Sequence, residues 1–269
     1  MNGKKILFVS SELMPYLPEN QVSQMSYETP RMVNSKGGQI RIFMPRYGNI
    51  NERRHQLHEV IRLSGMNLVI NDMDMPLIIK VASIPKERIQ VYFIDNEEYF
   101  KRKATFTDEN GDLFPDNDER AIFFAKGVVE TVKKLNWSPD VIHIHGWMAS
   151  LVPLYLKQFY ADEPLFADSK VVTSVYGKGF DNELDNGIVK KIGFDEIGED
   201  KISSLATPNY NNLLKVAVDY SDAVILASEE VPEELNEYIA NLKKPVLSYV
   251  PLQEFEEAYT NFYSNEVLK

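Results

Sequence analysis

A histidine, a tryptophan and a short glycine-rich stretch are the residues of this chain whose types and positions could hold a ligand. His145 and Trp147 follow the apolar run 141–144, and Gly177-Lys178-Gly179 follows a later run. In a parallel sheet, ligands bind beyond the carboxyl ends of the strands. We therefore expect these residues to converge on one crevice with Ser10–Tyr16, which follows the first apolar run. A lone Gly-x-Gly is a weak phosphate signal and is usually a turn.

Three further polar residues, Asp116, Asn117 and Arg120, open a predicted helix that runs to Leu135. Asp116 and Glu119 have the spacing of a capping box, so capping explains the first two residues without any ligand. Glu119 and Arg120 would then form a simple surface pair. The alternative is that Asp116, Asn117 and Arg120 line the crevice, and we keep these three as candidate substrate-binding residues.

The composition excludes several classes of function. The chain contains no cysteine, so disulfides, thiolate metal sites and a cysteine nucleophile are excluded. Its four histidines do not form a zinc-binding set, and we expect no metal and no cofactor. A formal net charge of −11 repels a phosphate backbone, so nucleic-acid binding is not expected.

The N-terminal residues and the hydropathy predict a cytoplasmic protein without a membrane partner. The apolar run after Lys4-Lys5 stops at Ser10, which makes it too short for the hydrophobic region of a signal peptide. No other stretch approaches the length of a membrane-spanning helix.

Short β-branched runs alternate with helical patterns along the chain, which is typical of a parallel sheet covered by helices. We predict one three-layer Rossmann-like α/β domain over residues 1–269, with a mainly parallel, twisted sheet. The expected strands of this sheet are 5–10, 39–45, 91–94, 141–144, 171–175, 223–227 and 246–250. The expected helices are 23–35, with Pro30 at a kink or in the first turn, 116–135, 147–160, 210–220, 231–242 and 254–267.

Two regions depart from this alternation. Residues 57–94 are strand-like with only short turns between them, which predicts a small antiparallel insert before the chain rejoins the main sheet. The polar segment 177–204 is predicted to be a long loop. The aromatic residues of the last helix, 254–267, have helical spacing, and we expect that helix to pack back onto the domain.

Several motifs, in a consistent order along the chain, resemble the family 5 glycosyltransferases, which are the bacterial glycogen and plant starch synthases. They are Val9–Pro15, Met44–Gly48, Val91–Phe100, Asp108–Arg120 and Pro139–Lys157. The resemblance runs from residue 5 to about residue 230. It implies one half of a two-domain glycosyltransferase, with a crevice for an α-glucan or another sugar.

The resemblance also implies roles for the two residues with which the sequence argument began. His145 would hydrogen-bond a sugar hydroxyl, and the alternative is a buried histidine that satisfies backbone groups at a strand end. Trp147 could stack on a glucose ring, although a tryptophan that opens a helix more often belongs to the core. Both interpretations of each residue stay open.

The sequence departs from the family where the nucleotide would bind. The family's Lys-x-Gly-Gly-Leu motif, whose glycines admit phosphates and whose lysine supplies charge, corresponds to Pro18-Glu19-Asn20-Gln21-Val22. The aspartate after the second histidine is replaced by Gly146, and the family's Ile-His-Asn corresponds to Val175-Tyr176-Gly177. The nucleotide site therefore looks dismantled, and we assign no catalytic residue.

In the family, a second Rossmann domain carries an arginine–lysine pair that neutralises the leaving phosphates. About forty residues follow Ser228, fewer than such a domain needs, and no arginine follows Arg120. Negative charge grows on the leaving group during transfer. We therefore expect the chain alone not to transfer glucose at a useful rate.

Three functions remain open on these residues. The leading expectation is a non-catalytic glucan-binding or regulatory module in storage-polysaccharide metabolism, which holds a glucan end through His145 and Trp147. The second is a glucosyltransferase from ADP-glucose to an α-1,4-glucan, active weakly or as half of a split enzyme whose partner chain supplies the second domain. The third is a structural subunit that binds a full-length synthase.

Overall fold

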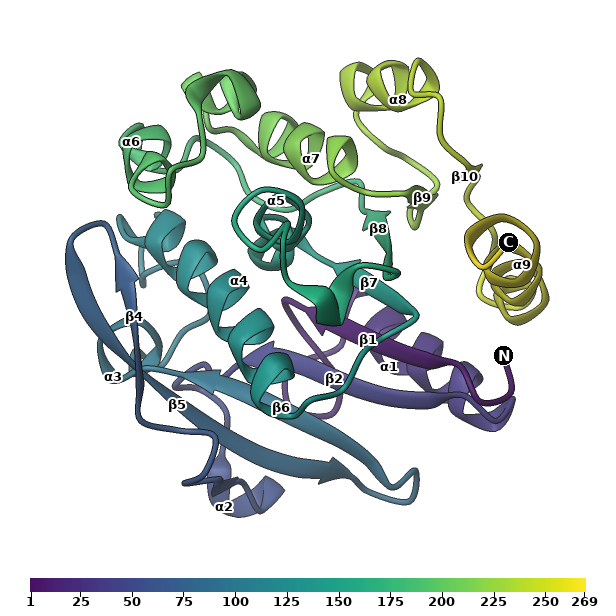
Figure 1. The fold of residues 1–269 in the computed structure, drawn as a ribbon, viewed down its shortest axis with the longest axis horizontal. Helices are drawn as coiled ribbons and strands as arrows, with labels where there is room; N and C mark the ends of the chain where they lie inside the picture. Colours follow the sequence, from purple (N-terminus) through teal and green to yellow (C-terminus); the bar gives the residue numbers. More distant parts are fainter.

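One mixed sheet organises the chain, and the computed structural model describes all 269 residues. The strand order is β10-β9-β8-β7-β1-β2-β6-β5-β3, and β4 pairs with β5 outside this path (Figure 1). The strands are β1 (Lys5–Ser10), β2 (Gln39–Pro45), β3 (His58–Glu59), β4 (Met66–Ile70), β5 (Met73–Ile84), β6 (Ile89–Asp95), β7 (Val141–His145), β8 (Lys170–Val175), β9 (Ala223–Leu226) and β10 (Val246–Leu247).

The pairing of the strands confirms the predicted fold class. From β10 to β6 every pair along the sheet is parallel, whereas β6 pairs with β5 antiparallel, as do β5 and β3 and β5 and β4. The antiparallel strands all fall within the predicted insert, and β6 returns the chain to the parallel sheet beside β2. The sheet twists visibly along its length (Figure 1).

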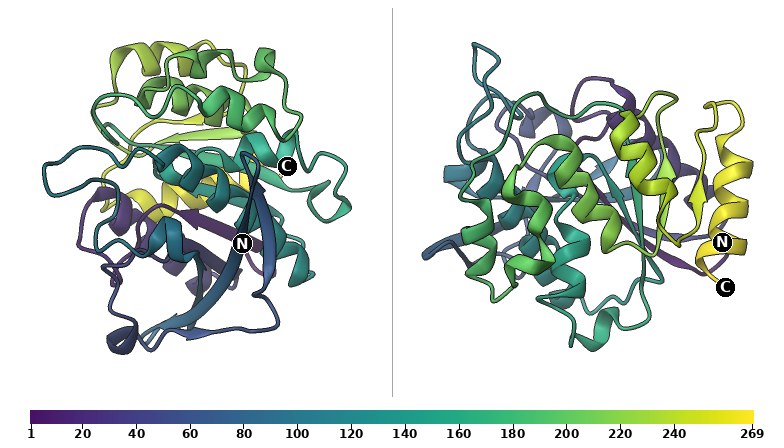
Figure 2. Two further views of the ribbon diagram at one scale, coloured as in Figure 1. Left: turned by 90° about the vertical axis from the view of Figure 1, so that its left-hand side faces the viewer. Right: turned by 90° about the horizontal axis from the view of Figure 1, so that it is seen from above.

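Helices cover both faces of the sheet and complete the three layers (Figure 2). On one face α1 contacts β1, β2 and α9, and on the other α4 contacts α5, which in turn contacts α7. None of the helices is both long and apolar enough to cross a membrane. The helices are α1 (Gln21–Ser35), α2 (Glu52–His55), α3 (Glu97–Phe100), α4 (Asn117–Lys134), α5 (Val152–Lys157), α6 (Ile188–Gly193), α7 (Tyr210–Asp219), α8 (Glu233–Ala240) and α9 (Phe255–Phe262).

Several elements differ from their predicted extents. The predicted helix 147–160 is divided into a 3-10 turn at Trp147–Ala149 and α5, because Pro153 has no backbone N–H and fits only in a first helical turn. The predicted loop 177–204 contains α6 and short 3-10 turns. At the C-terminus, α9 ends earlier than predicted and a π-helical turn, Tyr263–Val267, follows it.

Helix α1 begins two residues before its predicted start, because Asn20 caps it. The Asn20 side-chain oxygen accepts a hydrogen bond from the Ser23 backbone N–H at 2.8 Å, and the Ser23 hydroxyl accepts one from the Asn20 N–H at 2.9 Å. This reciprocal arrangement satisfies two N–H groups at the helix start that have no intrahelical partner. Pro30 consequently lies inside the helix rather than in its first turn.

A buried carboxylate joins the antiparallel insert to the main sheet. Asp95 ends β6 with 1% of its surface exposed, and its carboxylate contacts Arg46 Nε at 2.9 Å and Lys80 Nζ at 3.1 Å. Glu52 of α2 also contacts Lys80 Nζ, at 2.7 Å. These charges come from β5, β6, α2 and the residue after β2, so one ion-pair network fixes four segments.

Replacing Asp95 by asparagine should therefore destabilise the fold. Removing the buried Asp95 charge leaves Glu52 alone to compensate both Arg46 and Lys80, and we expect Asp95→Asn to lower the free energy of unfolding by about 3 kcal/mol in urea denaturation. The control is Glu266→Gln, which breaks an exposed pair with Lys269 and should cost less than about 1 kcal/mol. Equal effects of the two substitutions would contradict this account.

Candidate functional site

The residues that follow strands β1, β7, β8 and β9 meet at one edge of the sheet. The Ser11 hydroxyl accepts a hydrogen bond from the Met148 N–H at 2.8 Å, which ties the end of β1 to the end of β7. The Ser228 hydroxyl accepts one from the Gly177 N–H at 2.9 Å, which ties the end of β9 to the end of β8. The structure thus brings together the segments that the sequence placed around one crevice.

His145 is completely buried at this edge. One ring nitrogen, Nδ1, hydrogen-bonds the Tyr176 hydroxyl at 2.7 Å, and the other, Nε2, has no partner within the protein. Burial lowers the pKa of His145 to about 3, so the ring is neutral at physiological pH. The expectation that a buried His145 would satisfy backbone groups is wrong, because its one protein partner is a tyrosine hydroxyl.

The neighbouring His143 provides a comparison for this ring. Both of its nitrogens have partners: Nδ1 hydrogen-bonds the Tyr263 hydroxyl, and Nε2 hydrogen-bonds the Ser174 hydroxyl at 2.8 Å. Tyr263 lies in the π-helical turn after α9, so this bond ties the C-terminal segment to β7. His143 is therefore satisfied by the fold itself, whereas His145 keeps one free nitrogen.

Trp147 is buried rather than presented on a surface. Its ring lies between Phe106 and Phe180, with ring centroids 4.8 and 4.9 Å away, and only 3% of its surface is exposed. The indole Nε1–H has no partner within the protein. Phe180 also lines an open pocket of about 500 Å³ with Tyr210, so Trp147 lies one side chain beneath that pocket.

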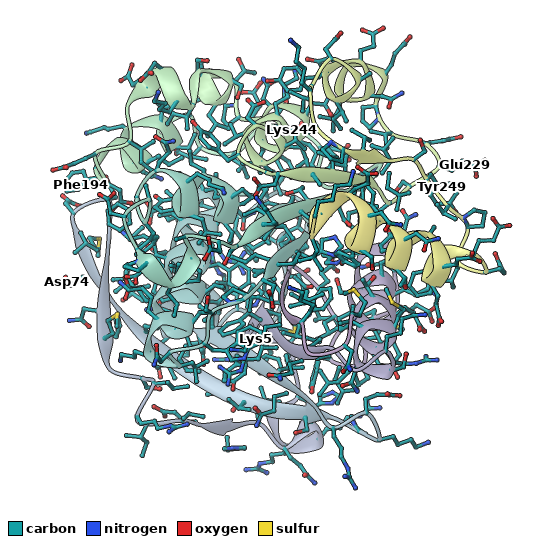
Figure 3. All side chains as sticks on the ribbon, turned by 45° about the vertical axis from the view of Figure 1, so that its right-hand side comes forward. Lys5, Asp74, Phe194, Glu229, Lys244 and Tyr249 are labelled. Carbon is teal, nitrogen blue, oxygen red and sulfur yellow. The ribbon has the colours of Figure 1, made fainter.

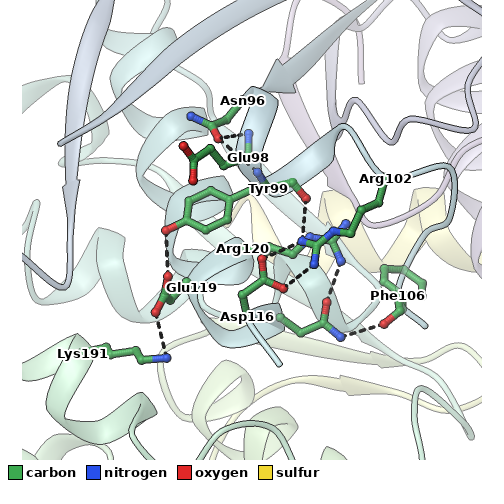
Figure 4. A network of polar contacts seen from close by, with 10 residues as sticks. Asn96, Glu98, Tyr99, Arg102, Phe106, Asp116, Glu119, Arg120 and Lys191 are labelled. Atoms are coloured by element: carbon green, nitrogen blue, oxygen red, sulfur yellow. Dashed lines mark hydrogen bonds and ion pairs between the residues drawn. The ribbon is translucent and has the colours of Figure 1, made fainter. Parts of the chain in front are cut away.

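Asp116 and Glu119 do not form the predicted capping box. The Asp116 carboxylate makes no cap hydrogen bond; instead it accepts two hydrogen bonds from the Arg102 guanidinium, at 2.6 and 2.8 Å (Figure 4). Glu119 accepts a hydrogen bond from the Tyr99 hydroxyl at 2.9 Å and pairs with Lys191. The Asp116 side chain binds Arg102 instead of capping the helix, because a bidentate arginine–carboxylate pair is stronger than a hydrogen bond from one neutral backbone N–H.

Arg120 is not a surface residue and does not pair with Glu119. It is fully buried, and its Nη1 donates a hydrogen bond to Asn117 Oδ1 at 2.6 Å (Figure 4). Asn117 in turn donates to the Phe106 carbonyl at 2.9 Å. Burial lowers the pKa of Arg120 to about 10, which leaves it charged, and its Nε and Nη2 have no partner.

Unpartnered buried polar atoms therefore gather around this edge of the sheet. Phe106 connects several of their side chains, because its ring contacts Trp147 and also Tyr47, which lies 5.6 Å from the Arg120 guanidinium carbon. Such atoms are rare in folded proteins, so a cluster of them requires an explanation. Those around this edge are Ser10 Oγ, Tyr47 Oη, Arg120 Nε and Nη2, His145 Nε2 and Trp147 Nε1, and others lie elsewhere in the fold.

The sequence argument missed Tyr47 as a member of this group. The available signal was its position, because Tyr47 follows β2 as Trp147 follows β7. Burial raises the pKa of Tyr47 well above its usual value, so the hydroxyl keeps its proton and can donate a hydrogen bond as well as accept one.

The side chains of Asn20 and Gln21, in the segment Pro18–Val22, are engaged within the protein. Asn20 caps α1 and donates a hydrogen bond from its side chain to the Glu12 carboxylate at 2.7 Å. Gln21 donates to the Ala227 carbonyl at 2.9 Å, so it too is occupied by the protein. These two side chains are therefore not available to a phosphate.

The open pockets beside this segment are acidic. Two pockets share Gly177 and Lys178, and Lys178 is their single basic residue. Its ammonium group is exposed and lies 3.5 Å from Asp181, while Glu229 and Glu230 line the second pocket. The Glu230 carbonyl approaches Gly177 so closely that a Cβ there would lie 2.0 Å from it. The side of the crevice next to Gly177 is thus lined by the acidic Glu229 and Glu230 and closed by the backbone of Glu230.

Comparison with known proteins gives a consistent relationship. The family model described as starch synthase catalytic domain matches residues 5–244. The glycogen synthase of Chlorobium limicola is 37% identical over 235 residues, which are 86% of this chain and 47% of that protein. The glycogen synthase of Chlorobaculum tepidum is 34% identical over 255 residues, 91% of this chain and 49% of that protein. The chain spans about half the length of the curated relatives it matches.

A solved structure shares the fold. The catalytic domain of Starch Synthase IV from Arabidopsis thaliana, bound to ADP and acarbose, superposes with a TM-score of 0.67 at 15% sequence identity. The match covers 83% of this chain and 45% of the other. At that identity the likeness concerns the fold alone.

The buried histidines make stability depend on pH. Burial lowers the pKa of both His143 and His145, so below about pH 6.5 the unfolded chain binds protons that the folded rings do not. The free energy of unfolding should fall as the pH drops from about 6.5 toward 3, with each ring contributing at most about 1.4 kcal/mol per pH unit.

The histidine contribution can be isolated with one variant. We expect His145→Asn to show a shallower loss of stability than the wild type between about pH 6.5 and 5, a window chosen above most carboxylate titrations. Urea denaturation at several pH values measures it. His58→Asn, at an exposed position of β3, is the control and should keep the wild-type slope. An unchanged slope for His145→Asn would refute the assignment.

Proposed function

This chain belongs to the starch synthase catalytic domain family, and on that premise we propose that it binds an α-glucan end or a related sugar without transferring glucose. It is then a glucan-binding or regulatory module of storage-polysaccharide metabolism. The cytoplasmic location and the single domain over residues 1–269 that the sequence suggests remain predictions within this proposal.

The unpartnered buried polar atoms at the ends of β1, β2 and β7 are the observation that carries the proposal. A sugar hydroxyl both donates and accepts hydrogen bonds, so it complements a mixed set of donors and acceptors. In this cluster the Trp147 Nε1–H and the free Arg120 N–H groups are donors. Nε2 of the neutral His145 ring can donate or accept, depending on the tautomer. Leaving such groups unpaired costs about 1–3 kcal/mol each, which favours an occupant that satisfies them.

The route into this cluster would pass Phe180. That side chain covers Trp147 and lines the pocket of about 500 Å³, a volume suitable for a small ligand. Displacement of Phe180 would expose the indole ring, and a sugar could then stack on it while its hydroxyls reach His145. Gly179 packs against Tyr210 in the same pocket, so the segment 177–180 is the element that would move.

The charges of the crevice support binding without transfer. A donor diphosphate requires cations and free backbone N–H groups, and its charge grows in the transition state. Pro18 and Glu19 replace the family's lysine and its neighbour, and Glu229 and Glu230 line the adjacent pocket. The three glutamates would repel a diphosphate, and Pro18 supplies no charge to neutralise it.

A second candidate is a glucosyltransferase, ADP-glucose to α-1,4-glucan, that works as half of a split enzyme. The solved relative of the same fold carries ADP and acarbose, and the curated relatives are about twice as long as this chain. Tyr249 and Leu252 are exposed apolar side chains, and Tyr249 lines a pocket with Glu229 (Figure 3). A second domain could cover them. A structural subunit of a full-length synthase remains the third candidate.

Calorimetry with maltoheptaose and ADP-glucose separates the candidates. We expect a heat of binding for maltoheptaose and none for ADP-glucose. Trp147→Phe keeps an aromatic ring but removes the Nε1–H, and it should weaken maltoheptaose binding about tenfold, the value of one buried hydrogen bond. The control is Trp137→Phe, at the only other tryptophan, which should leave the affinity unchanged. No binding of maltoheptaose would overturn the proposal.

A transfer assay tests the non-catalytic part separately. The purified chain is incubated with glycogen and radiolabelled ADP-glucose or UDP-glucose, and we expect no label in the polysaccharide. Labelled glycogen would contradict the proposal and favour the glucosyltransferase.

A further inference from the structure

A basic groove lies on the antiparallel side of the sheet. It is a cavity of about 600 Å³ between the end of α2 and the β5–β6 hairpin, the region at the lower end of the sheet in Figure 1. None of its lining residues belongs to the crevice. We define the basic groove by four of these residues: Arg54, His55, Lys86 and Arg88.

The cations of the basic groove have no counter-ions in the protein. Arg54, Lys86 and Arg88 are exposed, and none of them takes part in an ion pair. Two carboxylates of this region, Glu52 and Asp95, already pair with Arg46 and Lys80. Glu87 lies in the same hairpin but forms no ion pair with these cations. The groove is thus a local excess of positive charge on a chain of net charge −11.

The fold positions the backbone of the segments that carry these cations. Strand β3 pairs with β5 at His58 and Val81, which seats α2 against the hairpin. The Asn51 side chain caps α2 by accepting a hydrogen bond from the Arg54 N–H at 2.9 Å. The His55 ring packs against Tyr16 at a centroid distance of 4.9 Å. Arg54 and His55 therefore lie on a capped helical turn, and Lys86 and Arg88 lie in the hairpin between two paired strands.

The charge distribution favours a small anionic ligand over a large one. A long polyanion or a charged membrane would meet the acidic remainder of the surface, whereas a small anion interacts only within a Debye length of about 8 Å. The volume of the groove also suits a small molecule. Its arginine guanidinium groups match the oxygen pairs of a phosphate, which they bind in a bidentate manner.

We propose that the basic groove binds the phosphate groups of a small phosphorylated ligand, at a site separate from the sugar crevice. Arg54 and Arg88 approach the phosphate oxygens from opposite walls, α2 and the hairpin, while Lys86 and His55 flank them. The site has no catalytic role. It does not rest on the proposed glucan binding, because the two sites share no residue.

Inorganic pyrophosphate is the probe for this site. We expect calorimetry on the full chain to give a dissociation constant below about 1 mM. The double variant Arg54→Gln/Arg88→Gln should weaken binding at least tenfold. The control double variant, Lys170→Gln/Lys243→Gln, removes the same number of charges at exposed positions elsewhere and should bind as the wild type does.

Histidine ring signals in NMR spectra provide a second, local readout. Pyrophosphate should shift the signals of His55, whereas those of the buried His143 and His145 should stay in place. An equal loss of affinity in both double variants would show a general field effect and overturn the proposal. Absence of pyrophosphate binding would overturn it too.

A lipid headgroup is the other source of a phosphate group, and a sedimentation assay distinguishes it. Vesicles of phosphatidylcholine with phosphatidylglycerol should leave the chain in the supernatant. Sedimentation with the vesicles that the Arg54→Gln/Arg88→Gln variant abolishes would assign the groove to a membrane surface and refute the small-ligand proposal.

Discussion

The parallel pairing of β7 with β1 and β8 is the constraint on which the candidate site depends. Its register sets Ser10 beside His145 and His145 beside Ser174, so the ends of the three strands coincide. His145, at the end of a central strand, is fully buried, and desolvation lowers its pKa so that the ring is neutral. The chemistry left to it is neutral hydrogen bonding, which suits recognition of hydroxyl groups rather than neutralisation of phosphates.

Positive and negative charges are distributed unevenly between the two ends of the sheet. Around the parallel strands, Glu229 and Glu230 face the open pocket and the nearby Lys178 pairs with Asp181. Around the antiparallel strands, Arg54 and Arg88 have no counter-ions. If both proposals hold, the chain recognises hydroxyl groups at one place and phosphate groups at another.

The fold class followed from the sequence because it depends on local periodicity. Alternating apolar runs predicted the parallel strands, and the short turns of residues 57–94 predicted the antiparallel insert, both confirmed. The local pattern around Arg120 was misleading: capping and surface pairing are arguments about neighbours in sequence. Its actual environment comes from Tyr47 and Phe100, which are distant in the chain and become neighbours only when the sheet forms. Likewise, no local signal shows that Arg102 would bind Asp116.

The position of Trp147 between two phenylalanine rings has a spectroscopic consequence. An indole enclosed by apolar rings emits at shorter wavelengths than one in contact with water, and the chain contains just one other tryptophan. Any movement of Phe180 that admits solvent would shift the fluorescence toward the red. If the proposed route past Phe180 is used, Trp147 fluorescence reports its opening without any attached dye.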